Sequence, residues 1–289
     1  MSERGPMALA EAGSAGAELD PRGRFVAPWR LTPVLPSPDR AARVISRNIR
    51  VYRRGWVYLI SGFVEPFLYL LSMGVGLSHL VGGLSVGNKA VTYAQFVAPG
   101  LLAAQAMNGA IFDSTYNLYY KLKYAHTYEA VLATPISTSD LALGELGWAV
   151  LRGTIYAAAF LAVMAGLGMV DSYWAIACLP VATLLSFCFA GLGMAVTSYM
   201  RSWQDLDTAA LALLPLFLFS GTFYPLSVYP GALAWLVRVS PLYQGVDVIR
   251  SLDVGAVSVG LIWHVAELSA LGVLGLVLAG RRLQALLAP

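Results

Sequence analysis

Six long apolar runs dominate the pattern of hydrophobic and polar positions along this chain. Each is close to the roughly 20 residues that an α-helix needs to cross a bilayer. They cover about Trp56 to Leu80, Tyr93 to Tyr116, Glu145 to Val170, Trp174 to Met200, Thr208 to Tyr224, and Val257 to Gly280. The pattern predicts an all-α, polytopic membrane protein, with six transmembrane helices forming one transmembrane domain over residues 56–285.

The composition supports a membrane protein and gives no sign of a metal or disulfide scaffold. Hydrophobic residues make up 58% of the 289 residues and charged residues only 12%, and the mean hydropathy is +0.66. Soluble globular domains are usually more charged and less apolar. The two cysteines, Cys178 and Cys188, share one apolar run with no second pair or histidine nearby, so we expect no metal site.

The distribution of positive charge predicts the orientation of the chain. Nearly all of the Lys and Arg residues lie in or beside the N-terminal region, the loop at 117–144, the loop at 201–207 and the C-terminal end. Lys89, Arg238 and Arg250 are left for the opposite side. Because cytoplasmic loops carry the excess of Lys and Arg, we expect both termini in the cytoplasm.

Two segments precede the first apolar run. Residues 1–36 are rich in Ala, Gly and Pro and lack the continuous apolar stretch of a secretory signal, so we predict a disordered cytoplasmic tail. In residues 37–55, Ser37 and Pro38 are typical of a helix start.

Arginines at steps of three and four place one basic stripe along that second segment. The stripe consists of Arg40, Arg43, Arg47, Arg50 and Arg54. It predicts an interfacial amphipathic helix with its basic face toward lipid phosphates. Nucleic acid is a less favoured partner, because an apolar run follows at once.

The loop between the second and third runs has unusually strong helix signals. Leu122, Ala125, Tyr128 and Leu132 share one face of a helix that Pro135 ends, because proline cannot continue the hydrogen-bond ladder. The next residues contain a capping box, Ser137 with Asp140, which starts a new helix. We therefore expect the third transmembrane helix to begin in the cytoplasm, after a short amphipathic helix. An ordinary interfacial loop is the alternative.

Two charged residues lie within the predicted membrane-spanning runs. Glu65 and Arg152 lie at nearly matching depths in the first and third runs, and intramembrane charges usually have a partner, so we predict an ion pair between them. The alternatives are that Arg152 reaches the headgroups, that Glu65 is protonated, or that they relay protons.

The outer stretch from Pro225 to about Ala256 is too short to span and rich in proline. It predicts a re-entrant or interfacial helical pair, although a plain aromatic belt is the alternative. Its marked residues are Phe223, Tyr224, Pro225, Trp235 and Pro241.

The chain contains no recognisable catalytic or nucleotide-binding motif. No G-x-x-x-x-G-K-[ST] occurs, His79, His126 and His264 are far apart, and no G-x-S-x-G is found. We therefore expect no catalytic residue, no metal and no cofactor bound by this chain, and energy must come from a partner or an ion gradient.

Three segments resemble the membrane subunit (permease) of type-2 ABC exporters, in particular the nodulation-factor exporter permease and daunorubicin-resistance permease group. They are "FVAPGLLAAQAMNGAIFDSTYNLYY" (Phe96 to Tyr120), "YEAVLATPISTSDLALGE" (Tyr128 to Glu145) and "FLFSGTFYPLSVYPGALAWLVRVSPLYQGVDVIR" (Phe217 to Arg250). With the six-span layout, the resemblance covers about residues 38–285. The first 36 residues have no counterpart in it.

The resemblance implies a set of partners and roles. It implies a cytoplasmic coupling helix that contacts an ATPase subunit through Tyr128, Glu129, Leu132, Thr134 and Pro135, and an outer helical segment that caps the exit. Two ATPase copies, which hold the ATP and Mg, would join two permeases, either a homodimer or a related pair, in the bacterial plasma membrane.

The function implied is export of an amphipathic or lipid-linked substrate, such as a lipo-oligosaccharide, a glycolipid or a hydrophobic drug. The chain would then be a permease and not an enzyme. An ion-gradient-driven transporter using the carboxylates of Glu65 or Glu267 is the alternative.

Overall fold

The computed structural model describes residues 18–19, 25–26, 37–54, 64, 67–72, 76–77, 84–86 and 89–287. Most of the predicted tail at 1–36 and most of the first apolar run therefore lie outside the described residues. Among these described residues, strands occur only in two small antiparallel pairs. They are β1 (Glu18–Leu19) with β2 (Phe25–Val26), and β3 (Leu84–Val86) with β4 (Lys89–Val91). The remaining regular secondary structure of the described chain is helical, as predicted, and the helices are joined by turns and loops.

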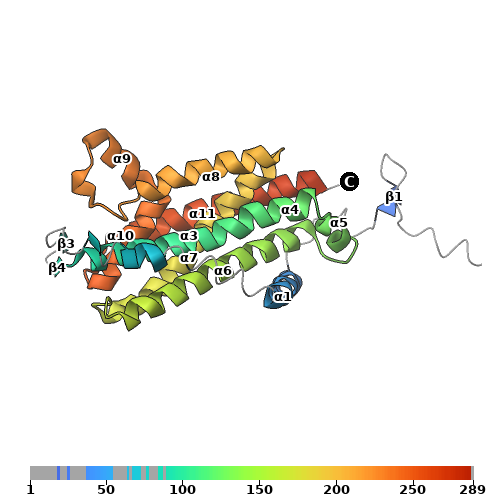
Figure 1. Ribbon diagram of the computed structural model, residues 1–289. Coiled ribbons are helices and arrows are strands. Elements are labelled where there is room, and N and C mark those ends of the chain that lie inside the picture. Colours follow the sequence, from blue (N-terminus) through green and yellow to red (C-terminus); the bar gives the residue numbers. More distant parts are fainter. Residues whose placement is uncertain are drawn as a thin grey trace, which may run out of the picture.

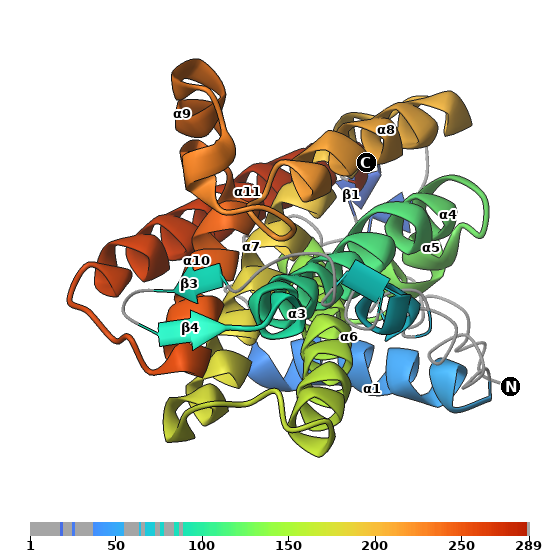
Figure 2. The ribbon, with the colours of Figure 1, turned by 60° about the vertical axis from the view of Figure 1, so that its left-hand side comes forward.

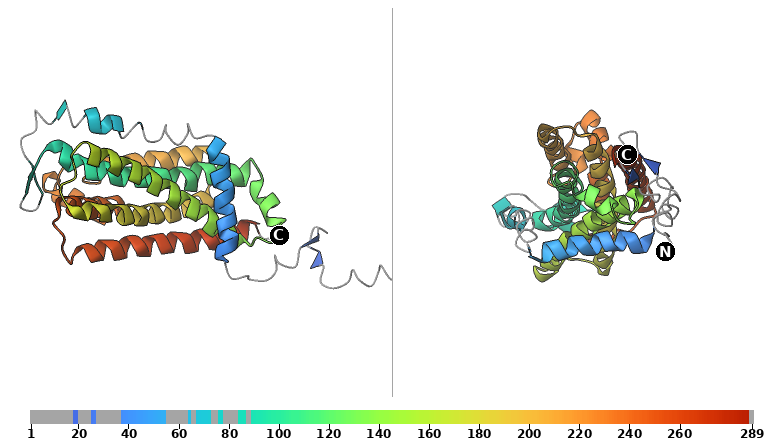
Figure 3. Two further views of the ribbon diagram at one scale, coloured as in Figure 1. Left: turned by 90° about the horizontal axis from the view of Figure 1, so that it is seen from below. Right: turned by 90° about the vertical axis from the view of Figure 1, so that its right-hand side faces the viewer.

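A bundle of long helices forms the body of the protein (Figure 1). Its members are α3 (Tyr93–Phe112), α6 (Thr138–Gly166), α7 (Cys178–Tyr199), α8 (Trp203–Leu218), α10 (Pro241–Val254) and α11 (Leu261–Leu287). Helix α7 is central, because it packs against α3, α6, α10 and α11. Helix α1 (Pro38–Arg54) crosses one end of the bundle at a steep angle, as the left view of Figure 3 shows.

Three described helical stretches are long and apolar enough to cross a membrane. They are Thr138–Gly166, Tyr173–Tyr199 and Leu261–Leu287, which correspond to the third, fourth and sixth predicted runs. The second of them opens with a short 3-10 turn, η5 (Tyr173–Ala177), which leads into α7. The count of six spans stays a prediction.

The second run is interrupted by a π-helical segment. Helix α3 begins at a capping box made by Thr92 and Gln95, passes into η4 (Asp113–Asn117) and continues as α4 (Leu118–Lys123). A π segment widens the helix by one residue and is frequent at functional sites. The helical run therefore continues beyond the predicted end at Tyr116, to Lys123, where the predicted coupling segment follows.

Several predicted helix ends need correction. The third helix begins after the Ser137 capping box, as predicted, but ends at Gly166 and not at Val170. Helix α8 ends at Leu218 rather than Tyr224, because the chain turns at Gly221, whose φ of +69° favours glycine. Helix α11 runs seven residues beyond the predicted Gly280, to Leu287.

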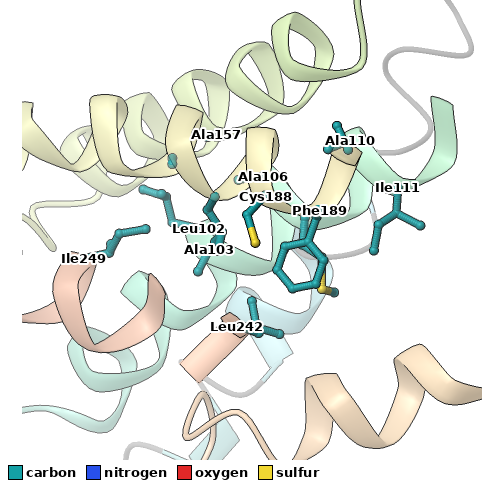
Figure 4. Packing of buried hydrophobic residues seen from close by; sticks show 14 of the residues in the cluster. Leu102, Ala103, Ala106, Ala110, Ile111, Ala157, Cys188, Phe189, Leu242 and Ile249 are labelled. Carbon is teal, nitrogen blue, oxygen red and sulfur yellow. The ribbon is translucent and has the colours of Figure 1, made fainter. Parts of the chain in front are cut away.

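Small residues allow the central helices to approach closely. A Cβ added to Gly153 of α6 would lie 2.6 Å from the carbonyl oxygen of Ala106 in α3, and one added to Gly191 of α7 would lie 2.6 Å from that of Gly272 in α11. Figure 4 shows the centre of this packing, where Leu102 of α3, Phe189 of α7 and Leu242 of α10 converge. Close backbone approach is the usual way in which membrane helices associate.

The outer segment is a pair of helices that differ in burial. After a short 3-10 turn, η6 (Leu226–Val228), helix α9 (Gly231–Val239) projects from the bundle, and Trp235 on it is 67% exposed (Figure 2). Helix α10 begins at Pro241 and is buried against α3 and α7. Arg250 of α10 donates hydrogen bonds to the carbonyl oxygens of Phe96 and Gly221 and so fixes the position of α10. The predicted pair of helices is therefore present, and its re-entry into a membrane stays a prediction.

Candidate functional site

Helix α1 is held against α6 by two of its arginines. Nε of Arg40 lies 2.8 Å from the carboxylate of Asp140, and Nη2 of Arg47 lies 3.1 Å from that of Glu145. Arg43 and Arg50 are exposed. The predicted single basic stripe is thus divided, because α6 offers carboxylates to the arginines that face it, while Arg43 and Arg50 point away from α6. The side chain of Arg54 lies outside the described residues.

One carboxylate joins the starts of two helices. Asp140 accepts from the backbone N–H of Ser37 at 2.6 Å, at the start of α1, and from that of Ser137 at 3.0 Å, at the start of α6. Its own N–H is capped by the Ser137 hydroxyl, which completes the predicted capping box. The angle between α1 and α6 therefore depends on this buried side chain.

A second buried carboxylate, Glu145, gathers three donors. Lys121 of α4 lies 2.7 Å from it, Arg47 of α1 lies 3.1 Å away, and the side-chain amide of Asn48 donates to it at 3.1 Å. Glu145 is almost fully buried, so its charge is neutralised by groups from two other elements. The cluster connects α1, α4 and α6 at the end of the bundle nearest the predicted coupling segment.

Arg152 has a buried partner from the π segment. Its Nη1 lies 3.1 Å from Oδ2 of Asp113, and it donates to the hydroxyls of Tyr52 and Tyr156 at 3.2 and 2.9 Å. Asn117 donates to both Asp113 and Tyr52 and closes the network.

The rings of Tyr52, Phe112 and Tyr156 lie around the guanidinium of Arg152, a cation–π arrangement. The predicted partner, Glu65, lies outside the described residues, so that pair stays a prediction. The partner that the structure gives to Arg152 is Asp113.

Asp113 and Glu145 were not among the sequence-predicted site residues. Both are acids inside or at the edge of an apolar run, which is itself a signal of a buried partner or a functional group. The signal was present for Asp113, but its partner comes from a different helix, which sequence spacing alone does not reveal.

A cavity of about 1090 Å³ opens beside these two clusters. Residues of α1, α3, η4, α4, α5 (Thr127–Leu132), α6 and α8 form its walls, together with Tyr69 and Ala125. The lining residues are Arg47, Asn48, Val51, Tyr52, Tyr69, Ala104, Met107, Asn108, Ile111, Phe112, Tyr116, Asn117, Tyr120, Lys121, Ala125, Thr127, Arg152, Tyr156, Ala210, Leu213, Leu214 and Phe217. Its size and mixed lining are those of a site for a small organic ligand.

The predicted coupling segment is split into two helices rather than one. The chain breaks at His126, whose φ of 45° is left-handed, and α5 (Thr127–Leu132) starts a new direction. Tyr128 and Leu132 are buried, at 1% and 5% exposure, and pack into the protein's own core. Their predicted role as contacts for a partner is therefore not supported by their position.

The remaining predicted coupling residues form the outer surface of α5 and its turn. Glu129, Thr134 and Pro135 are exposed, and Glu129 has a carboxylate oxygen 3.0 Å from the His126 ring. These three residues are free to meet another protein, while the buried pair on the opposite face fixes the position of the helix.

The loop at 201–207 lies beside α4. The rings of Tyr124 and Trp203 meet edge to face, with their centroids 5.8 Å apart. Asp205 accepts from the N–H groups of Arg201 and Ser202, and these hydrogen bonds lower the pKa of its carboxyl below the usual value. The two loops predicted to be cytoplasmic are therefore adjacent.

A comparison with protein families decides the class of the molecule. Residues 41–253 match the family described as "ABC-2 type transporter". The chain belongs to this family of transporter membrane proteins. A member of the ABC-2 family is a membrane transport component and not a catalytic enzyme. In the part of the chain that the structure describes, no cluster of His, Cys, Asp and Glu could hold a metal ion.

Relatives of this ABC-2 transporter include several nodulation proteins. Nodulation protein J of Rhizobium meliloti (strain 1021) is 29% identical over 250 residues, which cover 83% of this chain and 94% of that protein. Nodulation protein J of Rhizobium leguminosarum bv. trifolii is 31% identical over 76% of this chain and 86% of its own length. The inner membrane transport permease YadH of Escherichia coli (strain K12) is 24% identical over 71% of the chain and 79% of its own length. The predicted resemblance to the nodulation exporter permease group is confirmed.

Proposed function

We propose that this protein is the membrane-spanning permease subunit of an ATP-driven exporter that moves an amphipathic or lipid-linked substrate out of the cytoplasm. It works in the bacterial inner membrane with both termini in the cytoplasm. Two permeases, as a homodimer or with a related chain, associate with two ATPase subunits that hold the ATP and Mg. Family membership and the nodulation protein relatives support this assignment.

The observation that carries the proposal is the surface of α5. Glu129 on α5, and Thr134 and Pro135 in the turn after it, are exposed, while Tyr128 and Leu132 on the other face of α5 are buried in the core. Because one face of α5 is fixed in the core, a displacement of α5 by a partner would be passed on to the helices packed around it. This displacement reaches α4 and α6 directly, because they are the neighbours of α5 along the chain.

The clusters behind α5 connect it with the rest of the bundle. Glu145 links α6 to Lys121 on α4 and to Arg47 on α1, and Asp140 fixes the start of α6 against α1. Displacement of the α5 turn therefore moves α1, α4 and α6 together. Coupling between distant sites is carried by rigid elements that are connected by ion pairs and packed side chains, as these helices are.

A charge reversal on the exposed face tests the proposal. The full chain is co-purified with a candidate ATPase subunit that contains the motif G-x-x-x-x-G-K-[ST], and Glu129→Arg on α5 is compared with Lys123→Ala, which changes an exposed residue on α4. We expect Glu129→Arg to fold and insert normally but to weaken association by about 1–3 kcal/mol, or to leave hydrolysis running without export, as loss of an interface hot spot does. Lys123→Ala is expected to be nearly silent.

A substitution on the other face of α5, such as Leu132→Asp, cannot test contact with a partner. Leu132 is buried in the protein's own core, so an unpaired carboxylate there destabilises the fold before any partner is involved.

Wild-type association, hydrolysis and export in Glu129→Arg would refute the coupling role of α5. Transport by the permease alone in vesicles with an imposed ion gradient would instead favour the gradient-driven alternative based on Glu65 or Glu267.

A further inference from the structure

The large cavity has two chemically different ends. Toward α5 its wall carries the charged groups of Arg47 and Lys121, with the polar side chains of Asn48 and Thr127 beside them. Toward the middle of the bundle it is lined by Ala104, Met107, Leu213 and Phe217, which come from α3 and α8. A cavity with one cationic end and one apolar end matches the shape of an amphiphile.

The charge on the cavity wall is one-sided. Among the described residues that line it, three are cations, Arg47, Lys121 and Arg152, and none is a carboxylate. The balancing acids, Asp113 and Glu145, are buried behind these cations.

Among the described residues, the acids also number fewer than the cations they face. Glu145 is shared by Arg47 and Lys121, while Asp113 serves Arg152, so three described cations meet two described carboxylates. Within this part of the chain, the acids hold the cations in place from the protein side and leave one positive charge in excess. An anion on the cavity side would complete the balance with charge-assisted hydrogen bonds.

The length of the cavity fits a headgroup with a chain. Ala104 and Lys121 lie on the same helical run and both line it. Their separation along that run is about 25 Å at 1.5 Å per residue. One leaflet of the hydrocarbon core is about 15 Å thick, which leaves room for a polar head at the cationic end. A free small anion would fill only that end.

We propose that this cavity binds an amphiphile with an acidic headgroup, with the head on Arg47 and Lys121 and the apolar chain along α3 and α8. The inference deepens the proposed function by naming the substrate class, and it rests on that function only for the statement that the bound molecule is exported. Arg152 completes the cationic wall farther in, where its position is fixed by Asp113 and by the tyrosine hydroxyls.

The test measures lipid binding to the purified full chain in a neutral detergent by native mass spectrometry. Dioleoylphosphatidylglycerol and dioleoylphosphatidylcholine have the same chains and differ in net headgroup charge, and glycerol 3-phosphate is a charged head without a chain. We expect the anionic lipid to bind about tenfold more tightly than the zwitterionic one, and glycerol 3-phosphate not to compete with it. Equal binding of the two lipids overturns the headgroup assignment, and effective competition by glycerol 3-phosphate overturns the role of the chain.

Matched variants locate the binding. The double variant Arg47→Gln with Lys121→Gln is expected to lose the tenfold preference. Arg43→Gln with Arg50→Gln removes the same charge from the exposed side of α1 and is expected to keep it. Loss of the preference in the second double variant as well would place the binding on the outer surface and overturn the proposal.

A variant that keeps every charge covers the case in which the first double variant does not fold. Leu214 and Leu211 lie on the same helix and are 58% and 75% exposed, but only Leu214 lines the cavity. Leu214→Trp fills part of the apolar end and is expected to weaken binding of the anionic lipid at least about fivefold, while Leu211→Trp leaves it unchanged. Equal binding to both variants overturns the placement of the chain. The assay contains no ATPase, so failure of ATPase coupling leaves its outcome unaffected.

Discussion

Replacing Arg152 by leucine removes the cation at the centre of a buried polar network. Arg152 donates to Asp113 at 3.1 Å and to two tyrosine hydroxyls, and the side chains of both charged residues are at most 4% exposed. The leucine would leave Asp113 with only the hydroxyl of Tyr52 and the amide of Asn117. A carboxylate without its cation is then left in a buried position.

The expected loss follows from that burial. Breaking one side of a buried ion pair in a soluble protein costs about 3–5 kcal/mol, but polar contacts between membrane helices average nearer 0.6 and reach about 1.7 kcal/mol. Because Asp113 keeps two other donors, we expect Arg152→Leu to cost about 2–3 kcal/mol and Asp113→Asn somewhat less. The coupling between them is expected to be about 1–2 kcal/mol.

The measurement is a double-mutant cycle on the free energy of unfolding in mixed micelles, with both single variants and the double variant. A parallel cycle with Glu65→Gln and Arg152→Leu tests the pair predicted from sequence. Strictly additive effects of Asp113→Asn and Arg152→Leu would refute the ion pair seen in the structure. Coupling of Arg152 to Glu65 and none to Asp113 would show that the sequence-based pairing is the correct one.

Three further predictions concern packing, capping and topology. Gly153→Ala is expected to cost about 1–3 kcal/mol of stability in thermal unfolding because its Cβ meets Ala106 of the facing helix, whereas Gly280→Ala, in open space, costs nothing. Asp140→Ala removes the acceptor at the start of two helices and is expected to cost about 2–3 kcal/mol, more than Asp205→Ala, which starts only one. A cysteine at Gly231 is expected to react with an impermeant thiol reagent added outside intact cells, while the unsubstituted chain, whose cysteines are buried, does not; labelling from the inside alone would reverse the orientation.

Local signals predicted local structure well. The capping box at Ser137 and Asp140 predicted the start of α6 to the residue, because the side chains that make it lie within one turn. The arginine spacing predicted α1, because the period of a helix is a property of the segment itself. The end of α8 was placed six residues too late, because an apolar run continues past the point where Gly221 turns the chain.

Side-chain contacts between segments that are distant along the chain could not be predicted from the sequence. The acids that divide the basic stripe of α1 lie about a hundred residues later, on α6, so the spacing of the arginines contains no trace of them. The apolar face of α5 was identified, with Tyr128 and Leu132 on it, but a face does not state whether it is covered by the same chain or by a partner. Arg152 was expected to have a partner, and which acid reaches it depends on how η4 turns the helix.

The π segment at Asp113–Asn117 sets the rotational phase of everything that follows it. In an α-helix each residue turns the chain by about 100°, so deleting one residue there, and restoring regular α-helix, would swing Lys121 about that far around the axis of α4. Lys121 would then no longer meet Glu145, and α5 would leave the bundle on a different side. Length at this position is consequently fixed more strictly than residue identity. A homologue that lacks the extra residue needs a compensating insertion before α5 to present the same surface.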